Sequence, residues 1–195
     1  MKQYLLTRAF ARSLSLVVLL PLLFFVRPAA AQSVEDETWL LELQAVHLLL
    51  STIDSAPTRE HFEAAARDPV EVLIALAEHP LLHPMQRKAA VSALHQWPEE
   101  RVRGFYERIL ELGEPCLQSR AVVGLARAFG ESALPTLAQT LEAPDEALHN
   151  ATVAALGIVG EAAKPLLEQC VASSALSPLT QELARSELSR IEARP

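Results

Sequence analysis

Two histidines four residues apart, His79 and His83, are the first side chains in the sequence whose spacing suggests chemistry. Imidazoles at this interval bind zinc when both project from one face of a helix. Pro80 and Pro84 interrupt the segment, however, and predict a loop between two helices. No carboxylate or cysteine is spaced to complete a ligand set, so we expect no metal site here.

The two cysteines, Cys116 and Cys170, could carry thiol chemistry. Cys116 follows a proline at a predicted helix start, where the thiol pKa is lowered, but no histidine or asparagine is spaced to act as its partner. The two positions fall in repeats that are two units apart, which is beyond disulfide reach in an ordered stack. We therefore expect two separate thiols packed as small hydrophobic residues, and a redox role for either stays open.

Two glutamates, Glu107 and Glu111, lie four residues apart on one predicted helix. Arg103 and Arg108 stand beside them in the sequence. Mixed charges at such spacings are typical of a solvated helix face, because residues three and four apart are neighbours on a helix surface. We interpret this group as ordinary surface.

The remaining motifs are few. The triplet Asn150-Ala151-Thr152 is an N-glycosylation acceptor, but it lies inside a predicted helix rather than on a loop. The sequence contains no Gly-rich phosphate loop, no Gly-x-Ser-x-Gly elbow and no His-Glu-x-x-His pair. We therefore expect no catalytic residue, no cofactor and no metal.

The elements that position these side chains repeat along the chain. A leucine recurs at intervals of 31, 31 and 32 residues, as Leu94, Leu125, Leu156 and Leu188. A small residue stands four positions before each of them, and a large apolar residue follows within one turn. Proline precedes three of the leucines by ten residues, and proline fits only the first turn of a helix. This period predicts a series of helical hairpins, each ending in a leucine-bearing second helix.

The apolar periodicity predicts helices along the mature chain and no strand. After a polar Gln32–Thr38, the first helix is expected from about Trp39 to Ile53, and Thr58 is expected to cap a shorter helix that ends at Arg67. The later helices are expected at about 69–79, 84–97, 99–112, 115–129, 132–142, 145–159, 161–173 and 178–193. The predicted fold class is all-α, an α-solenoid of about five antiparallel helical hairpins, in which residues 32–67 form a degenerate capping repeat.

Residues 1–31 are typical of a cleaved signal peptide. Basic residues without any acid precede an apolar run from Leu14 to Val26, and Ala29 to Ala31 offer a cleavage site. The run is shorter than the roughly 20 apolar residues of a membrane span, and Pro21 interrupts it. We expect a mature domain of residues 32–195, exported to a bacterial periplasm or the cell exterior without stable membrane anchoring.

The mature chain is acidic. Of the 17 Lys and Arg residues four belong to the leader, whereas all 24 Asp and Glu residues follow it, so 13 basic residues face 24 acidic ones and the formal charge is −11. Binding to nucleic acid depends on a surplus of basic side chains that neutralise phosphates. We therefore exclude nucleic acid as a partner.

The segment LHNATVAALGIVGEAAKPLL resembles the HEAT-repeat family. The match rests on Ala155, Leu156, Gly157 and Gly160 in a second helix, followed by Pro165 in the next helix. The resemblance covers about 69–191 and implies pairs of antiparallel helices that stack into a right-handed solenoid. It implies protein binding in general, since a fold alone does not specify a function.

The chain departs from the family at one polar position. The family has an arginine seven residues before the recurring leucine, and here the four positions hold Arg87, Gln118, His149 and Gln181. Only one of them is arginine, so we expect the polar ladder between repeats to be weak.

The resemblance also places a binding surface, because second helices of the family line the concave face. Residues opposite the recurring leucines are left for this surface, with an apolar centre and a polar rim, which is typical of a modest protein- or peptide-binding groove. The expected partner-binding residues are Ser92, Gln96, Val123, Arg127, Asn150, Ala154, Ile158 and Arg190. The alternative is that Val123 and Ile158 pack against neighbouring helices and the rest is ordinary surface.

We thus expect an exported, non-enzymatic scaffold that binds a protein or peptide segment. One alternative is an enzyme or enzyme-associated factor, since some HEAT-like proteins resemble lyases for bilin attachment or DNA-base glycosylases. Another is a structural homo-oligomer, because Leu41 and Leu48 lie off the main apolar stripe of the first helix. Packing of these leucines within a capping repeat is the simpler interpretation.

Overall fold

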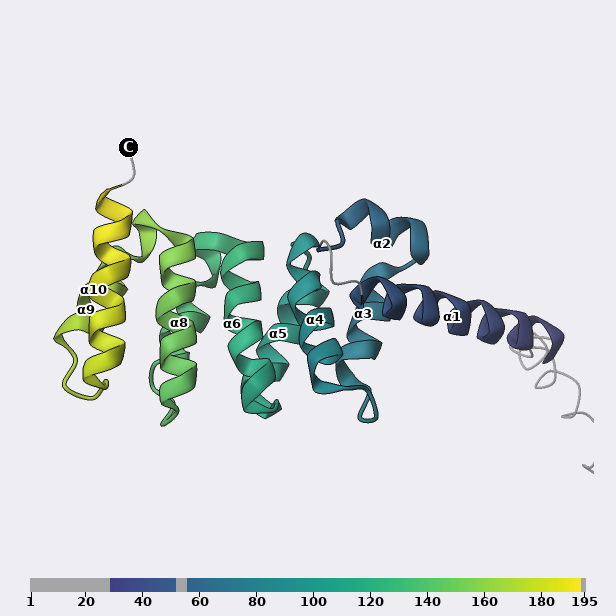
Figure 1. The fold of residues 1–195 in the computed structure, drawn as a ribbon, viewed down its shortest axis with the longest axis horizontal. Helices are drawn as coiled ribbons and strands as arrows, with labels where there is room; N and C mark the ends of the chain where they lie inside the picture. The colour runs from purple at the N-terminus through teal and green to yellow at the C-terminus, as the bar shows by residue number, and fades with distance from the viewer. Residues whose placement is uncertain (1–28, 52–55, 194–195) are drawn as a thin grey trace, which may run out of the picture. The chain divides into compact units, whose positions relative to one another are not determined.

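The computed structural model describes residues 29–51 and 56–193, and its described part is helical without any strand (Figure 1). The all-α prediction is therefore confirmed. The predicted signal peptide lies outside the described residues except for 29–31. The chain divides into two units between Leu40 and Leu41, and each is described by itself. Of the first unit the structure describes 29–40, the start of helix α1.

The α-helices follow one another along the chain with short connections. Their bounds are α1 (Ala29–Leu50), α2 (Arg59–Ala65), α3 (Pro69–Glu78), α4 (Pro84–Ala93), α5 (Glu100–Leu112), α6 (Pro115–Phe129), α7 (Leu134–Thr140), α8 (Glu146–Val159), α9 (Lys164–Ala172) and α10 (Pro178–Glu192). Short 3₁₀ helices extend α4 at Leu94–Gln96 and precede α7 at Gly130–Ala133 and α9 at Glu161–Ala163.

Helix α1 differs from its predicted range. It begins at Ala29 instead of Trp39 and ends at Leu50 instead of Ile53, which lies outside the described residues. The expected polar lead-in, Gln32–Thr38, is therefore helical. The physical reason is that neither proline nor glycine interrupts the chain from Ala29 to Leu50, and alanine and glutamate favour helix in the absence of a tertiary constraint.

The later helix ends agree closely with the capping signals in the sequence. Asp68 caps α3 by accepting a hydrogen bond from the Glu71 amide at 3.1 Å, and Asp145 accepts from two amides at the start of α8. Thr58 and His61 form a capping box at α2. Gly160, which follows α8, has φ of 84°, a conformation that a residue with a side chain rarely adopts.

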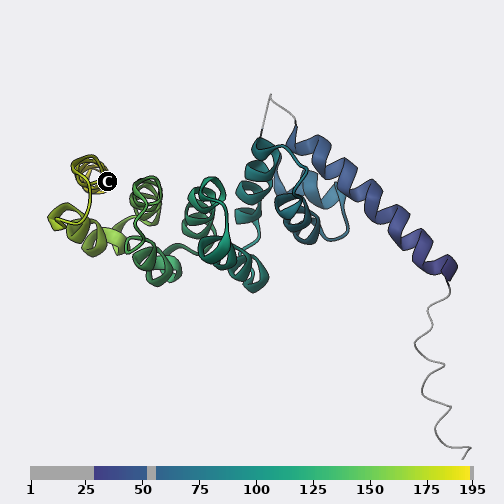
Figure 2. The same cartoon turned by 90° about the horizontal axis from the view of Figure 1, so that it is seen from below.

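Within the second unit the helices pair as hairpins and also contact along one row. Helix α3 packs on α4, α5 on α6, α7 on α8 and α9 on α10. The second helix of each hairpin also packs on the next one, so that α4 contacts α6, α6 contacts α8 and α8 contacts α10. Figures 1 and 2 show α6 and α8 side by side in two perpendicular views.

The recurring leucines form the centre of this packing. Leu94, Leu125 and Leu156 are fully buried, and so are the small residues four positions before them. Leu188 is half-buried, because α10 has a second-helix neighbour on one side only among the described helices. Small residues at these positions let neighbouring second helices approach each other closely.

A buried tyrosine joins three helices. The Tyr106 hydroxyl on α5 donates a hydrogen bond to the Val91 carbonyl of α4 at 3.0 Å. Its ring lies against Gly124 of α6, where the Cβ atom of any other residue would collide with the ring. Burial raises the pKa of Tyr106, so this hydroxyl remains a donor at every physiological pH. The contact fixes one hairpin against the next.

The packing predicts how truncation of the leucine row affects stability. Replacing Leu156, which is 0% exposed, by alanine should lower the free energy of unfolding by about 2–5 kcal/mol, because a cavity is left in the core. The matched control is Ile158→Ala two residues later, where the side chain is 37% exposed and the loss should be under about 1 kcal/mol. Urea unfolding measures both, and equal losses would contradict the helical register.

Candidate functional site

A side-chain donor seven residues before each recurring leucine joins the two helices of a hairpin. Arg87 Nε donates to the Ala77 carbonyl at 2.8 Å, and Gln118 Nε2 donates to the Leu110 carbonyl at 2.8 Å. His149 Nε2 lies 2.5 Å from the Ala143 carbonyl, so the ring donates through this nitrogen. These carbonyls lie at or just beyond the C-terminal end of a first helix, where intrahelical donors run out.

The hairpin of α9 and α10 has the same arrangement, and we name the hydrogen bonds of these four donors the hairpin clasps. Gln181 Nε2 donates to the carbonyls of Ser173 and Leu176 at 2.9 and 3.1 Å. Of the four donors, Arg87 also pairs with the following hairpin, through Nη1 and a Glu114 oxygen 2.8 Å apart. The polar position therefore acts mainly within each hairpin, where it holds the first helix on the second.

The predicted partner-binding residues all retain some solvent exposure. Arg127, Ile158 and Arg190 are exposed, whereas the other five are half-buried, namely Ser92, Gln96, Val123, Asn150 and Ala154. None is in the core, because each lies across its helix from a recurring leucine or beside that position.

Three of these residues bind other parts of the chain. Gln96 Nε2 donates to the Pro57 carbonyl at 3.3 Å, and Asn150 Oδ1 accepts from the Thr180 hydroxyl at 2.8 Å. Arg190 forms an ion pair with Glu187 on its own helix. Helical angles cannot reveal the contacts of Gln96 and Asn150, because these depend on which part of the chain lies next to the surface.

His79 and His83 both accept hydrogen bonds from nearby backbone amides. His79 Nδ1 accepts a hydrogen bond from the Leu81 amide, and His83 Nδ1 accepts from the Met85 amide, each at 3.3 Å. His83 thereby caps α4. Among the described residues there is no group of three or more His, Cys, Asp or Glu side chains that could hold a metal ion.

The glycosylation triplet is engaged in packing. The Thr152 side chain is fully buried and shares a 2.7 Å hydrogen bond with Thr140 of α7. Both cysteines are free thiols. Cys170 is 2% exposed and burial raises its pKa, whereas Cys116 is half-buried with its Sγ 3.9 Å from a Glu114 oxygen.

Sequence reasoning missed a row of hollows between successive first helices. One lies between α3 and α5, with a volume of about 300 Å³, and one between α7 and α9, with about 250 Å³. A third, which we name the α5–α7 hollow, is larger than these two, with a volume of about 470 Å³. Each is lined by residues of two hairpins, so no local sequence window contains its wall.

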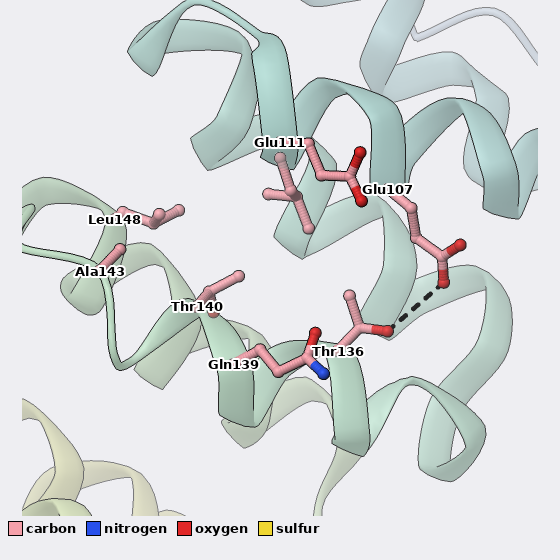
Figure 3. A pocket seen from close by; sticks show the side chains of 8 residues that line it. Glu107, Glu111, Thr136, Gln139, Thr140, Ala143 and Leu148 are labelled. Carbon is pink, nitrogen blue, oxygen red and sulfur yellow. Dashed lines mark hydrogen bonds between the residues drawn. The ribbon is translucent and has the colours of Figure 1, made fainter.

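The α5–α7 hollow has an acidic wall and a mixed floor (Figure 3). Glu107 and Glu111 of α5 face Thr136, Gln139 and Thr140 of α7 across the opening. The Thr136 hydroxyl donates to Glu107 Oε1 at 3.4 Å. The remaining lining is apolar and consists of Leu110, Ala143 and Leu148.

The arginines next to these glutamates in sequence bind elsewhere. Arg103 Nη2 donates to the Ser132 hydroxyl at 2.7 Å and its guanidinium lies over the Phe129 ring. Arg108 Nη2 pairs with Glu78 at 2.8 Å. The expectation that Glu107 and Glu111 belong to a mixed-charge solvated face is therefore incomplete, because both line a hollow and their neighbouring cations serve other partners.

No family model matches the sequence, and no curated protein matches it. Within the described residues, no helix combines the length and the apolar character that crossing a membrane requires.

Proposed function

We propose that the chain is an exported, non-enzymatic interaction module of the HEAT-like α-solenoid type, which binds a protein or peptide segment on its second helices. The observation that carries this proposal is the contact row from α4 through α6 and α8 to α10. Repeated packing of equivalent helices is what a solenoid requires, and it produces an extended surface rather than a single pocket.

The chemistry of that surface suits a protein segment. Val123, Ala154 and Ile158 retain partial exposure near its centre, and the exposed Arg127 lies one turn from Val123 on α6. An apolar centre surrounded by polar side chains is the common anatomy of a protein interface. Because the apolar side chains are few and partly covered, we propose weak or transient binding. The proposed export rests on the signal-like residues 1–31.

Acidic substitutions at the centre of the surface test this proposal. We expect the triple variant Val123→Asp, Arg127→Asp and Ile158→Asp to lose capture of a binding partner from a cell-envelope extract, because it replaces apolar contacts by desolvated charge. The control carries three aspartates at exposed positions outside the second helices, Ala64, Leu81 and Ala162. Circular dichroism verifies that both variants are folded, and equal capture by both would contradict the proposed surface.

A second candidate function is self-association through α1. Leu41 and Leu48 are 60% and 69% exposed, whereas Val46 between them is fully buried, so this part of α1 packs on one side and leaves leucines on another. Leu41 and Leu48 offer an apolar patch on a helix that is already packed, and a second copy of the chain would cover it. This candidate is a structural homo-oligomer.

Light scattering separates the two candidates. If α1 mediates self-association, the wild-type protein should have at least twice the mass of the chain, and Leu41→Glu with Leu48→Glu should reduce it to one chain mass, since a charge opposes apolar burial. Gln44→Glu, at an exposed position on the same helix, is the control. A wild-type mass equal to one chain would exclude the oligomer.

A further inference from the structure

The α3–α5 and α5–α7 hollows occupy equivalent places in successive repeats, and the hairpin clasps show which of their lining residues correspond. Arg87 clasps Ala77, and Gln118 clasps Leu110 in the next hairpin. The residue after each clasped carbonyl is a glutamate, Glu78 in the first case and Glu111 in the second. The opposite wall carries Arg108 in the α3–α5 hollow and Gln139 in the α5–α7 hollow. These two residues are 31 positions apart, which is the interval between the recurring leucines.

In the α3–α5 hollow the chain itself supplies a cation. Arg108 Nη2 lies 2.8 Å from a Glu78 oxygen, and the guanidinium lies over the Phe105 ring with 5.4 Å to its centre. Arg87 and Glu114 form a second ion pair at the same hollow. The equivalent glutamate position therefore accepts a guanidinium in this fold, with apolar surface beneath the side chain.

In the α5–α7 hollow that cation is replaced. Glu111 corresponds to Glu78, but Gln139 stands where Arg108 stood, and its amide carries no charge. The hollow is also larger, about 470 Å³ against about 300 Å³. Among the ion pairs of the described residues, none includes Glu111 or the neighbouring Glu107. Two carboxylates thus line this hollow, whereas the equivalent hollow one repeat earlier is lined by an arginine that pairs with its glutamate.

The rest of the lining suits a long cationic side chain. Leu110, Ala143 and Leu148 offer apolar contact for an aliphatic stem, and the hydroxyl of Thr136 already orients one oxygen of Glu107. Like charges four residues apart on a helix repel each other, and a cation between Glu107 and Glu111 removes that repulsion. A planar guanidinium can donate to two carboxylates at once, whereas a metal ion demands a fuller set of oxygen ligands.

We propose that the α5–α7 hollow binds an arginine side chain of a partner protein, which takes the place that Arg108 occupies in the preceding hollow. This site lies on first helices, so it goes beyond the surface proposed above and does not depend on it. The acidity of the chain favours encounter with a basic segment.

The test is a titration of the isotope-labelled protein, followed by nuclear magnetic resonance, with the tripeptide acetyl-Gly-Arg-Gly-amide. We expect saturable shifts of the amide signals of Thr136, Gln139 and Thr140. The same peptide with norleucine in place of arginine should bind at least about tenfold more weakly, because it lacks the charge-assisted hydrogen bonds. Calcium chloride alone should not shift these signals to saturation.

A double variant tests whether Glu107 and Glu111 bind the arginine side chain. Glu107→Gln with Glu111→Gln should weaken arginine binding at least about tenfold, whereas Glu131→Gln with Glu168→Gln removes the same charge at exposed positions elsewhere and should leave binding unchanged. Gln139→Arg should abolish binding of the tripeptide, because the new side chain can pair with Glu111 as Arg108 pairs with Glu78.

Four results would overturn the proposal: no saturable shift with the arginine peptide, equal binding of the norleucine peptide, equal weakening in both glutamine double variants, or saturation of the site by calcium alone. The two peptides and calcium are compared on wild-type protein, so these arms decide even if a variant does not fold. The triple aspartate variant of the second-helix surface should bind the arginine peptide as wild type does, which keeps failure of this site distinct from failure of that surface.

Discussion

The hydrogen bond from a second-helix side chain to the carbonyl end of the first helix sets the geometry of each hairpin. A helix leaves its last carbonyls without intrahelical partners, and burying them against another helix is costly unless a donor reaches them. Arg87 and Gln118 supply that donor in the last turn of α3 and α5, whereas His149 and Gln181 donate to carbonyls just after the end of α7 and α9. Each of the four donors stands seven residues before a recurring leucine. The clasp therefore fixes the end of one helix relative to the buried leucine of the other.

The same constraint explains why the two rows of helices differ. Second helices meet through buried alanine, threonine and leucine side chains, so their packing is close. The clasps hold each first helix to the second helix of its own hairpin, and hollows remain between successive first helices. The charge of each hollow depends on which residue stands at a single lining position. An arginine at position 108 pairs with Glu78 in one hollow, whereas a glutamine at position 139 leaves the carboxylates of the next without an internal cation.

Helix limits from Pro69 to the end of α10 were predictable because their signals are local. Asp68, Asp145 and several first-turn prolines mark helix starts independently of packing. The predicted start of α1 was wrong. The segment from Ala29 to Trp39 contains no proline or glycine that would end a helix, and its polar composition alone suggested an irregular lead-in. The α5–α7 hollow could not be predicted, since Glu111 and Gln139 belong to different hairpins and become neighbours only through stacking.

Equilibrium unfolding of Gln118→Leu in urea tests the hairpin clasp most directly. This change keeps the side-chain volume but leaves the Leu110 carbonyl without its side-chain donor, so the free energy of unfolding should fall by about 1–3 kcal/mol. Gln118→Arg restores the donor found at Arg87 and should recover most of that loss. Gln169→Leu, on the exposed side of α9, is the control. Equal stability of Gln118→Leu and the control would contradict the claim that the clasp holds the hairpin together.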